Sequence, residues 1–175
     1  GPAVVASIAS ILNQAPVRVS GVWRAPRAKG TVPALQADRP LRVLLVEDNR
    51  VNQVVAGRLL EKLGCQVILA DTGAAAVRLH AEADFDLVLM DLQMPVMDGF
   101  QATARILERD QATGRTVPII AITANAMSGD RERCLEAGMD DYLTKPIGLA
   151  DLLQAITRTV SPRLTISAPV SALRA

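Results

Sequence analysis

From Leu41 onward, short apolar runs alternate with longer segments whose apolar residues recur at helical spacing. The apolar runs predict five strands, and the longer segments predict five helices. Strands and helices that alternate in this way form a parallel sheet, because each helix carries the chain back across the sheet before the next strand begins. The pattern therefore predicts an α/β fold: a five-stranded parallel sheet with helices on both faces, in a doubly wound (βα)5 order.

The boundaries of these elements follow from periodicity and from capping residues. The strands are predicted at Arg42–Val46, Gln66–Ala70, Asp86–Asp91, Val117–Ile122 and Asp141–Thr144. The helices are predicted between the cap Asn49 and Gly64, and then at Thr72–Ala83, Met97–Asp110, Ser128–Ala137 and Leu149–Val160. In the first helix we expect the apolar stripe to face the core; it consists of Val51, Val54, Val55, Leu59 and Leu63.

The remaining residues flank this predicted domain, which covers residues 41–160. Residues 1–40 contain proline and glycine scattered among arginine and alanine, which is typical of a linker or tail, and could include the end of a preceding domain. Residues 161–175 are predicted to be a C-terminal tail, too short for a DNA-binding domain. The apolar stretch Pro2–Leu12 is too short to span a bilayer, so we expect no membrane contact by this segment.

The charge distribution and the low aromatic content argue against nucleic-acid binding, and the few cysteine and histidine residues suggest no site of their own. The net charge is +1, but acidic side chains outnumber basic ones within residues 41–160, and aromatic residues make up only 2% of the chain. An acidic, aromatic-poor domain is not expected to bind nucleic acid. Cys65 and Cys134 are predicted to be buried free thiols of a reducing compartment. The single histidine, His80, is predicted at a surface position of a helix.

Polar side chains follow four of the five predicted strands at the point where each strand ends. Glu47 and Asp48 follow the first strand, Asp91 ends the third, Thr123 follows the fourth and Lys145 follows the fifth. Because the carboxyl ends of parallel strands meet at one edge of the sheet, these side chains are predicted to converge there. Three converging carboxylates need a cation, and oxygen ligands favour Mg²⁺. With a lysine and a hydroxyl beside them, they form a site suited to a phosphoryl group.

Sequence motifs around these positions support the same interpretation. They are the acidic pair Glu47–Asp48, Asp91 followed by Met94–Pro95 and Asp98–Gly99, Thr123–Ala124, and the segment Asp140–Pro146. In these motifs residues 41–160 resemble a receiver domain of two-component signalling, which has a flavodoxin-like fold. The segments Glu47–Gln53, Gln93–Gly99 and Ala121–Met127 resemble especially the receivers attached to hybrid histidine kinases.

The resemblance implies a role for each matching residue. Asp91 would accept a phosphoryl group from a phosphohistidine. Asp48, Asp91 and the backbone carbonyl of Gln93 would bind Mg²⁺, with Glu47 acting mostly through water. Lys145, in a predicted cis bond to Pro146, would pair with the phosphoryl oxygens. Further implied roles are closure of Thr123 on the phosphoryl group, inward rotation of Tyr142, and control of phosphoryl lifetime by Gln93 and Asn125.

The resemblance also implies partners, namely a histidine kinase domain, a histidine phosphotransfer domain, or both. We expect no kinase catalytic core in this chain, only self-catalysed phosphotransfer and dephosphorylation. We also expect a cytoplasmic domain whose parent kinase could be attached to the inner membrane. One alternative is a stand-alone response regulator that binds a protein target when phosphorylated. A more remote one is a flavodoxin-like nucleotide-binding enzyme, which would need a glycine-rich phosphate loop where Glu47–Asp48–Asn49 stands. The oligomeric state stays open.

Overall fold

The computed structural model describes residue 35, residues 39–124 and residues 128–160. The strands are β1 (Arg42–Val46), β2 (Gln66–Ala70), β3 (Leu87–Asp91), β4 (Ile119–Thr123) and β5 (Asp141–Thr144). The helices are α2 (Arg50–Lys62), α3 (Gly73–Glu82), α4 (Gly99–Thr113), α5 (Ser128–Glu136) and α6 (Leu149–Val160). The strands form one parallel sheet in the order β2-β1-β3-β4-β5, which confirms the predicted fold class.

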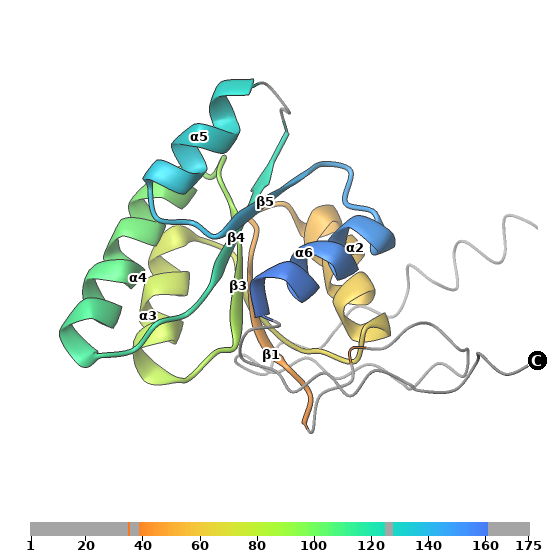
Figure 1. The fold of residues 1–175 in the computed structure, drawn as a ribbon, viewed down its shortest axis with the longest axis horizontal. Helices are drawn as coiled ribbons and strands as arrows, with labels where there is room; N and C mark the ends of the chain where they lie inside the picture. The colour runs from red at the N-terminus through yellow and green to blue at the C-terminus, as the bar shows by residue number, and fades with distance from the viewer. Residues whose placement is uncertain (1–34, 36–38, 125–127, 161–175) are drawn as a thin grey trace, which may run out of the picture.

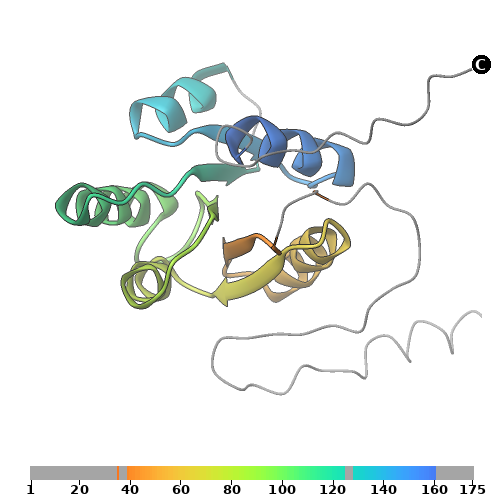
Figure 2. The ribbon, with the colours of Figure 1, turned by 60° about the horizontal axis from the view of Figure 1, so that its bottom comes forward.

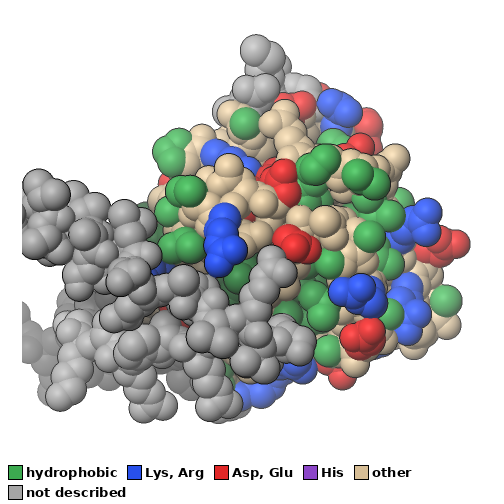
Figure 3. Space-filling view, turned by 180° about the vertical axis from the view of Figure 1, so that it is seen from behind, with side chains coloured by type: hydrophobic (Ala, Val, Ile, Leu, Met, Phe, Trp, Pro, Cys, Tyr) green, Lys and Arg blue, Asp and Glu red, His purple; other side chains and the backbone are tan. Residues whose placement is uncertain are grey.

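Helices cover both faces of the sheet (Figure 1), and a cluster of buried hydrophobic residues lies on each face. Helices α2 and α6 cover one face, where Leu60 and Ile156 pack against β1, β3 and β4. Helices α3, α4 and α5 cover the other, and Figure 2 shows the two groups of helices on opposite sides of the strands. Because both faces are covered, β3 and β4 are buried along their whole length. On the surface seen in Figure 3, acidic and basic side chains are interspersed with hydrophobic ones.

Local signals account for several helix ends. The side chain of Asn49 accepts hydrogen bonds from the backbone N–H of Val51 at 2.9 Å and of Asn52 at 3.3 Å, so it caps α2 as predicted. Asp98 and Gln101 form a capping box at the start of α4. The predicted start of this helix, at Met97, is therefore two residues too early.

Other boundaries also differ from the prediction by one to three residues. Helix α4 continues past Asp110 to Thr113, because the left-handed residue that ends it is Gly114, with φ 69°. Strand β4 begins at Ile119, since the N–H of Val117 donates to the Asp110 carboxylate instead of to a neighbouring strand. Asp86 lies just before β3 and not in it. Its carboxylate accepts two 2.7 Å hydrogen bonds from the guanidinium group of Arg39.

The predicted orientation of α2 is wrong in its first half. Val51, Val54 and Val55 are 70%, 45% and 49% exposed, whereas Ala56 and Leu60 are buried against the sheet. Both sets of residues recur at helical spacing, so periodicity alone allows two faces. The small side chains of Ala56 and Gly57 let the helix approach the sheet closely, and this packing leaves the valines in solvent.

We expect Leu60→Ala to lower the free energy of unfolding by about 2–5 kcal/mol, because it opens a cavity beneath α2. The matched change Val55→Ala, five residues earlier on the exposed face of the same helix, should alter it by no more than about 0.5 kcal/mol. Urea unfolding of the two variants measures the difference. Equal losses would contradict the orientation of α2 seen here.

His80 is buried, which corrects its predicted surface position. Its Nε2 lies 2.7 Å from Oδ1 of Asp110, and the other oxygen of Asp110 accepts the N–H of Val117 at 2.7 Å. The histidine thus joins α3 to α4 through a partner 30 residues away in sequence. Such a partner cannot be found from local periodicity.

Two further sequence predictions are confirmed. Cys65 and Cys134 are buried and free, and burial raises the pKa of the Cys65 thiol to about 12, which makes its thiolate scarce at neutral pH. The Lys145–Pro146 peptide bond is cis. Within the described part of the chain, no helix combines the length and the apolar character needed to cross a membrane.

Candidate functional site

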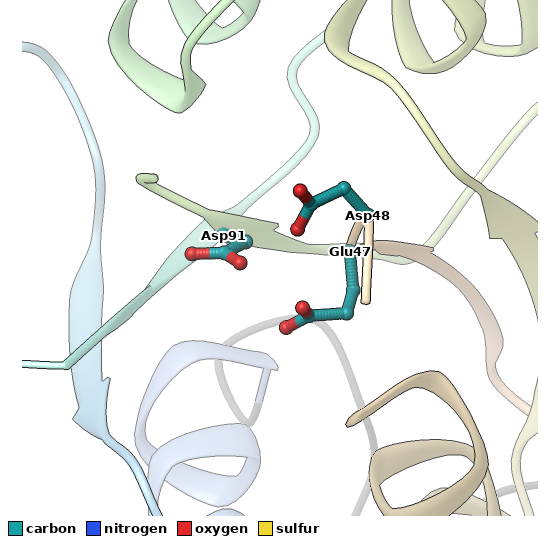
Figure 4. A group of neighbouring side chains, drawn as sticks. All are labelled: Glu47, Asp48 and Asp91. Carbon is teal, nitrogen blue, oxygen red and sulfur yellow. The ribbon is translucent and has the colours of Figure 1, made fainter. Parts of the chain in front are cut away.

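Three carboxylates converge at the carboxyl end of the sheet (Figure 4). Glu47 and Asp48 follow β1, and Asp91 is the last residue of β3. Strands β1 and β3 are adjacent and parallel, and Val46 pairs with Met90, so the next residue on each strand is a carboxylate at the same level. One oxygen from each of the three residues lies within 4.8 Å of the others. The register of two neighbouring strands therefore creates the cluster.

The three carboxylates differ in exposure. Glu47 and Asp91 are each only 1% exposed, whereas Asp48 is exposed. Two buried negative charges at this separation repel each other strongly unless a cation lies between them. Asp48 lies at the solvent side of the pair, where it can reach an ion or molecule that enters from outside.

Lys145 supplies a positive charge from the end of β5, which is an edge strand of the sheet. Its Nζ lies 2.7 Å from Oδ2 of Asp91 and 2.8 Å from Oε2 of Glu47, so a single ammonium group bridges both buried carboxylates. The backbone N–H of Lys145 donates to the carbonyl oxygen of Thr123 at 2.8 Å, which ties the end of β5 to the end of β4. Side chains from β1, β3 and β5 thus meet at one point.

The remaining carboxylate oxygens are oriented by nearby amides. Oε1 of Glu47 accepts hydrogen bonds from the backbone N–H of Asn49 at 3.2 Å and from Nδ2 of Asn52 at 3.0 Å. Oδ1 of Asp91 accepts the backbone N–H of Gln93 at 3.0 Å. Each buried carboxylate therefore has one oxygen on Lys145 and the other on neutral donors.

No role was predicted for Asn52 or Gln53 from the sequence. Both residues lie in the first turn of α2. The side-chain amide of Gln53 donates to the backbone carbonyl of Glu47 at 2.6 Å, beside the bond that Asn52 makes to the carboxylate. Two adjacent amide residues just after a capped helix start were the available signal. The sequence also offered no reason for a glycine at position 99. In the structure a Cβ there would overlap the carbonyl oxygen of Asp91, so only glycine lets α4 begin this close to the strand.

For both Asp91 and Lys145, burial and ion pairing shift the pKa in opposite directions. Burial raises the pKa of Asp91 and nearby Glu47 adds to this, while hydrogen bonds from Lys145 and Gln93 partly offset it. Burial alone would lower the pKa of Lys145, but its hydrogen bonds to Asp91 and Glu47 and the attraction of their charges together outweigh that effect and raise it. Lys145 therefore stays protonated at neutral pH, and the cluster retains an excess of acidic groups that a further cation would stabilise.

The donor set fits a small hard cation. The available ligand atoms are all oxygens, from Asp48, Asp91, Glu47 and the nearby backbone, with no imidazole or thiolate among the described residues of the cluster. Oxygen-only sites with an open side favour Mg²⁺, which keeps several waters, over Zn²⁺. Bound Mg²⁺ would neutralise charge on the oxygens around it.

The other predicted site residues that the structure describes lie on β4, on β5 and in the loop after β3. Thr123 is buried at the end of β4, and Tyr142 is half-buried on β5. Tyr142 pairs with Ala121, two residues before Thr123, so both side chains belong to the same face of the sheet. Gln93 is exposed, two residues after the end of β3. Asn125 lies outside the described residues.

Comparison with known proteins places this arrangement in a family. The family model of the response regulator receiver domain matches residues 43–157. The chain belongs to the response regulator receiver domain family. The sensor protein GacS of Pseudomonas syringae pv. syringae is 43% identical to it over 150 residues, which are 83% of this chain and 16% of GacS. The receiver domain therefore corresponds to a small part of a much longer relative.

Solved structures of receiver domains agree with the fold. The receiver domain of the sensor histidine kinase PA1611 from Pseudomonas aeruginosa is 49% identical, with a TM-score of 0.63 over 70% of this chain and 98% of that one, and it holds a magnesium ion in its active site cleft. The receiver domain of Ssk1 from Saccharomyces cerevisiae, crystallised with the histidine phosphotransfer protein Ypd1, provides a second match. It is 34% identical, with a TM-score of 0.68 over 74% of this chain and 94% of that one.

In this receiver domain we expect Lys145→Met to lower the free energy of unfolding in EDTA by on the order of 2–3 kcal/mol, because it leaves two buried carboxylates without their shared cation. Added Mg²⁺ should raise the melting temperature of the variant more than that of the wild type, since the ion replaces part of the missing charge. Calorimetry with and without Mg²⁺ measures both effects.

Lys62→Met, at an exposed lysine near the end of α2, is the matched control and should behave like the wild type. A Lys145→Met variant as stable as the wild type in EDTA would mean that the ion pair contributes nothing to the fold.

Proposed function

We propose that the domain takes a phosphoryl group from a phosphohistidine onto Asp91, with Mg²⁺, as one step of a phosphorelay. The observation that carries this proposal is the single ammonium group of Lys145 shared by two buried carboxylates, beside an exposed third one. A carboxylate in a strongly acidic cluster is a poor acceptor for a negatively charged phosphoryl group unless cations offset the repulsion. Lys145 supplies one such charge, and the cluster fits a second.

In this proposal one oxygen of Asp91 attacks phosphorus, the P–N bond to the donor imidazole breaks, and the imidazole leaves with the bonding electron pair and takes up a proton. Asp48, Asp91 and the carbonyl of Gln93 are the ligands we assign to Mg²⁺, with Glu47 acting mainly through water. Lys145 would move from its two carboxylates toward the new phosphoryl oxygens, which are stronger acceptors. Gln93 and Asn125 are the residues we assign to control of phosphoryl lifetime.

The donor we propose is a histidine kinase domain or a histidine phosphotransfer domain, and the parent protein a cytoplasmically facing hybrid histidine kinase. Support comes from GacS, a much longer sensor protein, and from the Ssk1 receiver, which was crystallised with Ypd1. The exposed Val51, Val54 and Val55 on α2 offer an apolar surface beside the site for such a protein. In this assignment residues 41–160 are the receiver, between a linker and a C-terminal tail.

We expect incubation with acetyl phosphate and Mg²⁺ to add one phosphoryl group to the wild type, and none to Asp91→Asn, because the amide cannot act as the acceptor. Asp48→Ala should lose both Mg²⁺ binding and most phosphorylation, since it removes a metal ligand without touching the acceptor. Intact-protein mass spectrometry measures the modification, and titration of Mg²⁺ measures the binding. An Asp48→Ala variant that is modified at the wild-type rate would refute the metal assignment.

We further propose that Thr123 and Tyr142 carry the signal away from Asp91. They share a face of the sheet on adjacent strands, at diagonal positions where side chains can contact each other. An aspartyl phosphate adds negative charge and acceptor oxygens, which would draw the Thr123 hydroxyl inward and open space for Tyr142 to follow. The surface of α5, β5 and α6 would then change.

We expect Thr123→Ala to be modified at Asp91 and yet to show a smaller change around Tyr142, because the lost hydroxyl weakens coupling without removing the acceptor. Amide chemical shifts recorded with and without beryllofluoride, a mimic of the phosphoryl group, measure the change. Asp91→Asn should show none. An undiminished shift at Tyr142 in Thr123→Ala would mean that another residue transmits the signal.

A further inference from the structure

Val96 has an unusual backbone conformation in the loop between β3 and α4. Its φ is 69°, and among the described residues it is the only one other than glycine with a positive φ. The N–H of Met97 donates to the carbonyl of Pro95 at 2.8 Å, so these three residues form a γ-turn with Val96 at its centre. The γ-turn with positive φ is the rarer and more strained of the two forms, and a β-branched side chain makes it more costly.

The loop on either side of Val96 is packed against the body of the domain. A Cβ on Gly73 would come within 2.7 Å of the carbonyl oxygen of Met97, so the start of α3 is in tight contact with the turn. Gly99 packs against the backbone of Asp91 and Leu92 in the same way. The backbone of the strained turn is therefore held between α3 and the end of β3, and this backbone sets the direction of the Cα–Cβ bond of Val96.

The side chain of Val96 is 104% exposed, the most exposed of the large hydrophobic residues described. The residue lies in the loop between β3 and α4, next to Met97, whose carbonyl oxygen lies close to Gly73 at the start of α3. Val51, which is 70% exposed, lies at the start of α2. Val96 and Val51 are thus exposed apolar residues in the segments that follow β3 and β1, the two strands whose ends carry Asp91 and Glu47.

We call the surface around the carboxylate cluster, with Val96 and Val51, the rim of the site. Transfer from a protein donor requires the donor to cover this rim. Asp91 is 1% exposed, so a donor imidazole must enter the mouth of the site to bring its phosphorus within bonding distance. The protein surface around that imidazole then lies against the rim, and an apolar side chain there loses its water. A small donor such as phosphoramidate can enter without touching the rim.

We propose that Val96 is a contact residue for the donor protein: the strained turn presents a rigid apolar side chain that packs against the apolar surface around the donor histidine. The inference rests on the proposed function and adds a residue that sets the rate of transfer from protein donors. A side chain held in one direction loses little conformational freedom on binding, so its burial contributes nearly in full to the stability of the complex.

The test compares two donors that carry the same P–N bond, phosphoramidate and phosphorylated Ypd1, on the full chain with Mg²⁺. Val96→Asn is polar and tolerates positive φ, whereas Val96→Ile keeps an apolar, β-branched side chain. We expect Val96→Asn to lower kcat/KM for phospho-Ypd1 by about tenfold, mainly through KM, because the loss of one buried valine is of that size. Val96→Ile should retain the wild-type value.

With phosphoramidate, all three proteins should react at the same rate. Leu135→Gln, at an exposed leucine near the end of α5, is the control for loss of an apolar surface residue away from the site, and should leave both donors unaffected. Melting temperature supplies a second readout: Val96→Asn should be at least as stable as the wild type, because it relieves the strained turn.

Three results would overturn the inference. One is a wild-type kcat/KM for phospho-Ypd1 in Val96→Asn. Another is an equal loss with both donors, which would mean that the turn only positions the acceptor loop. The third is a wild type that accepts phosphoryl groups from phosphoramidate but none from phospho-Ypd1. A wild type that reacts with neither donor would instead refute the proposed function itself.

Discussion

The structure depends on a balance of charge at the carboxyl end of the sheet. Glu47 and Asp91 are buried side by side because β1 and β3 are parallel neighbours in register, and this arrangement is tolerable only with the ammonium group of Lys145 between them. Lys145 directly follows β5, an edge strand, so the ion pair also joins the end of β5 to the ends of β1 and β3. The acidic site and the topology of the sheet therefore require each other.

The two faces of the sheet contribute differently to this site. On one face α2 supplies the amides of Asn52 and Gln53 that orient Glu47, and its first turns leave valines exposed. On the other, the His80–Asp110 pair joins α3 to α4 within the core. The strained turn at Val96 is supported from that second, firmly packed side. A site built on rigid supports can hold its acceptor, its cation and its rim in fixed relative positions.

Strain and exposed apolar surface occur together at the rim. The positive φ of Val96 is unfavourable for the isolated domain, and the same residue is fully exposed. Elsewhere in the described chain, positive φ is confined to glycines, at Gly64, Gly114 and Gly138, where helices end. The departure at Val96 therefore coincides with the place where the proposed chemistry requires contact with another protein.

The sequence by itself determined the order and type of every element, the fold class and the strand-end positions of Glu47, Asp48, Asp91, Thr123 and Lys145, because alternating apolar runs and capping residues are local signals. It also located Lys145–Pro146 as a cis bond. Only the tertiary structure decided which face of α2 is buried, that His80 pairs with Asp110, and that one lysine bridges two carboxylates. These features join residues far apart in the chain, and the packing that selects them has no counterpart in local periodicity.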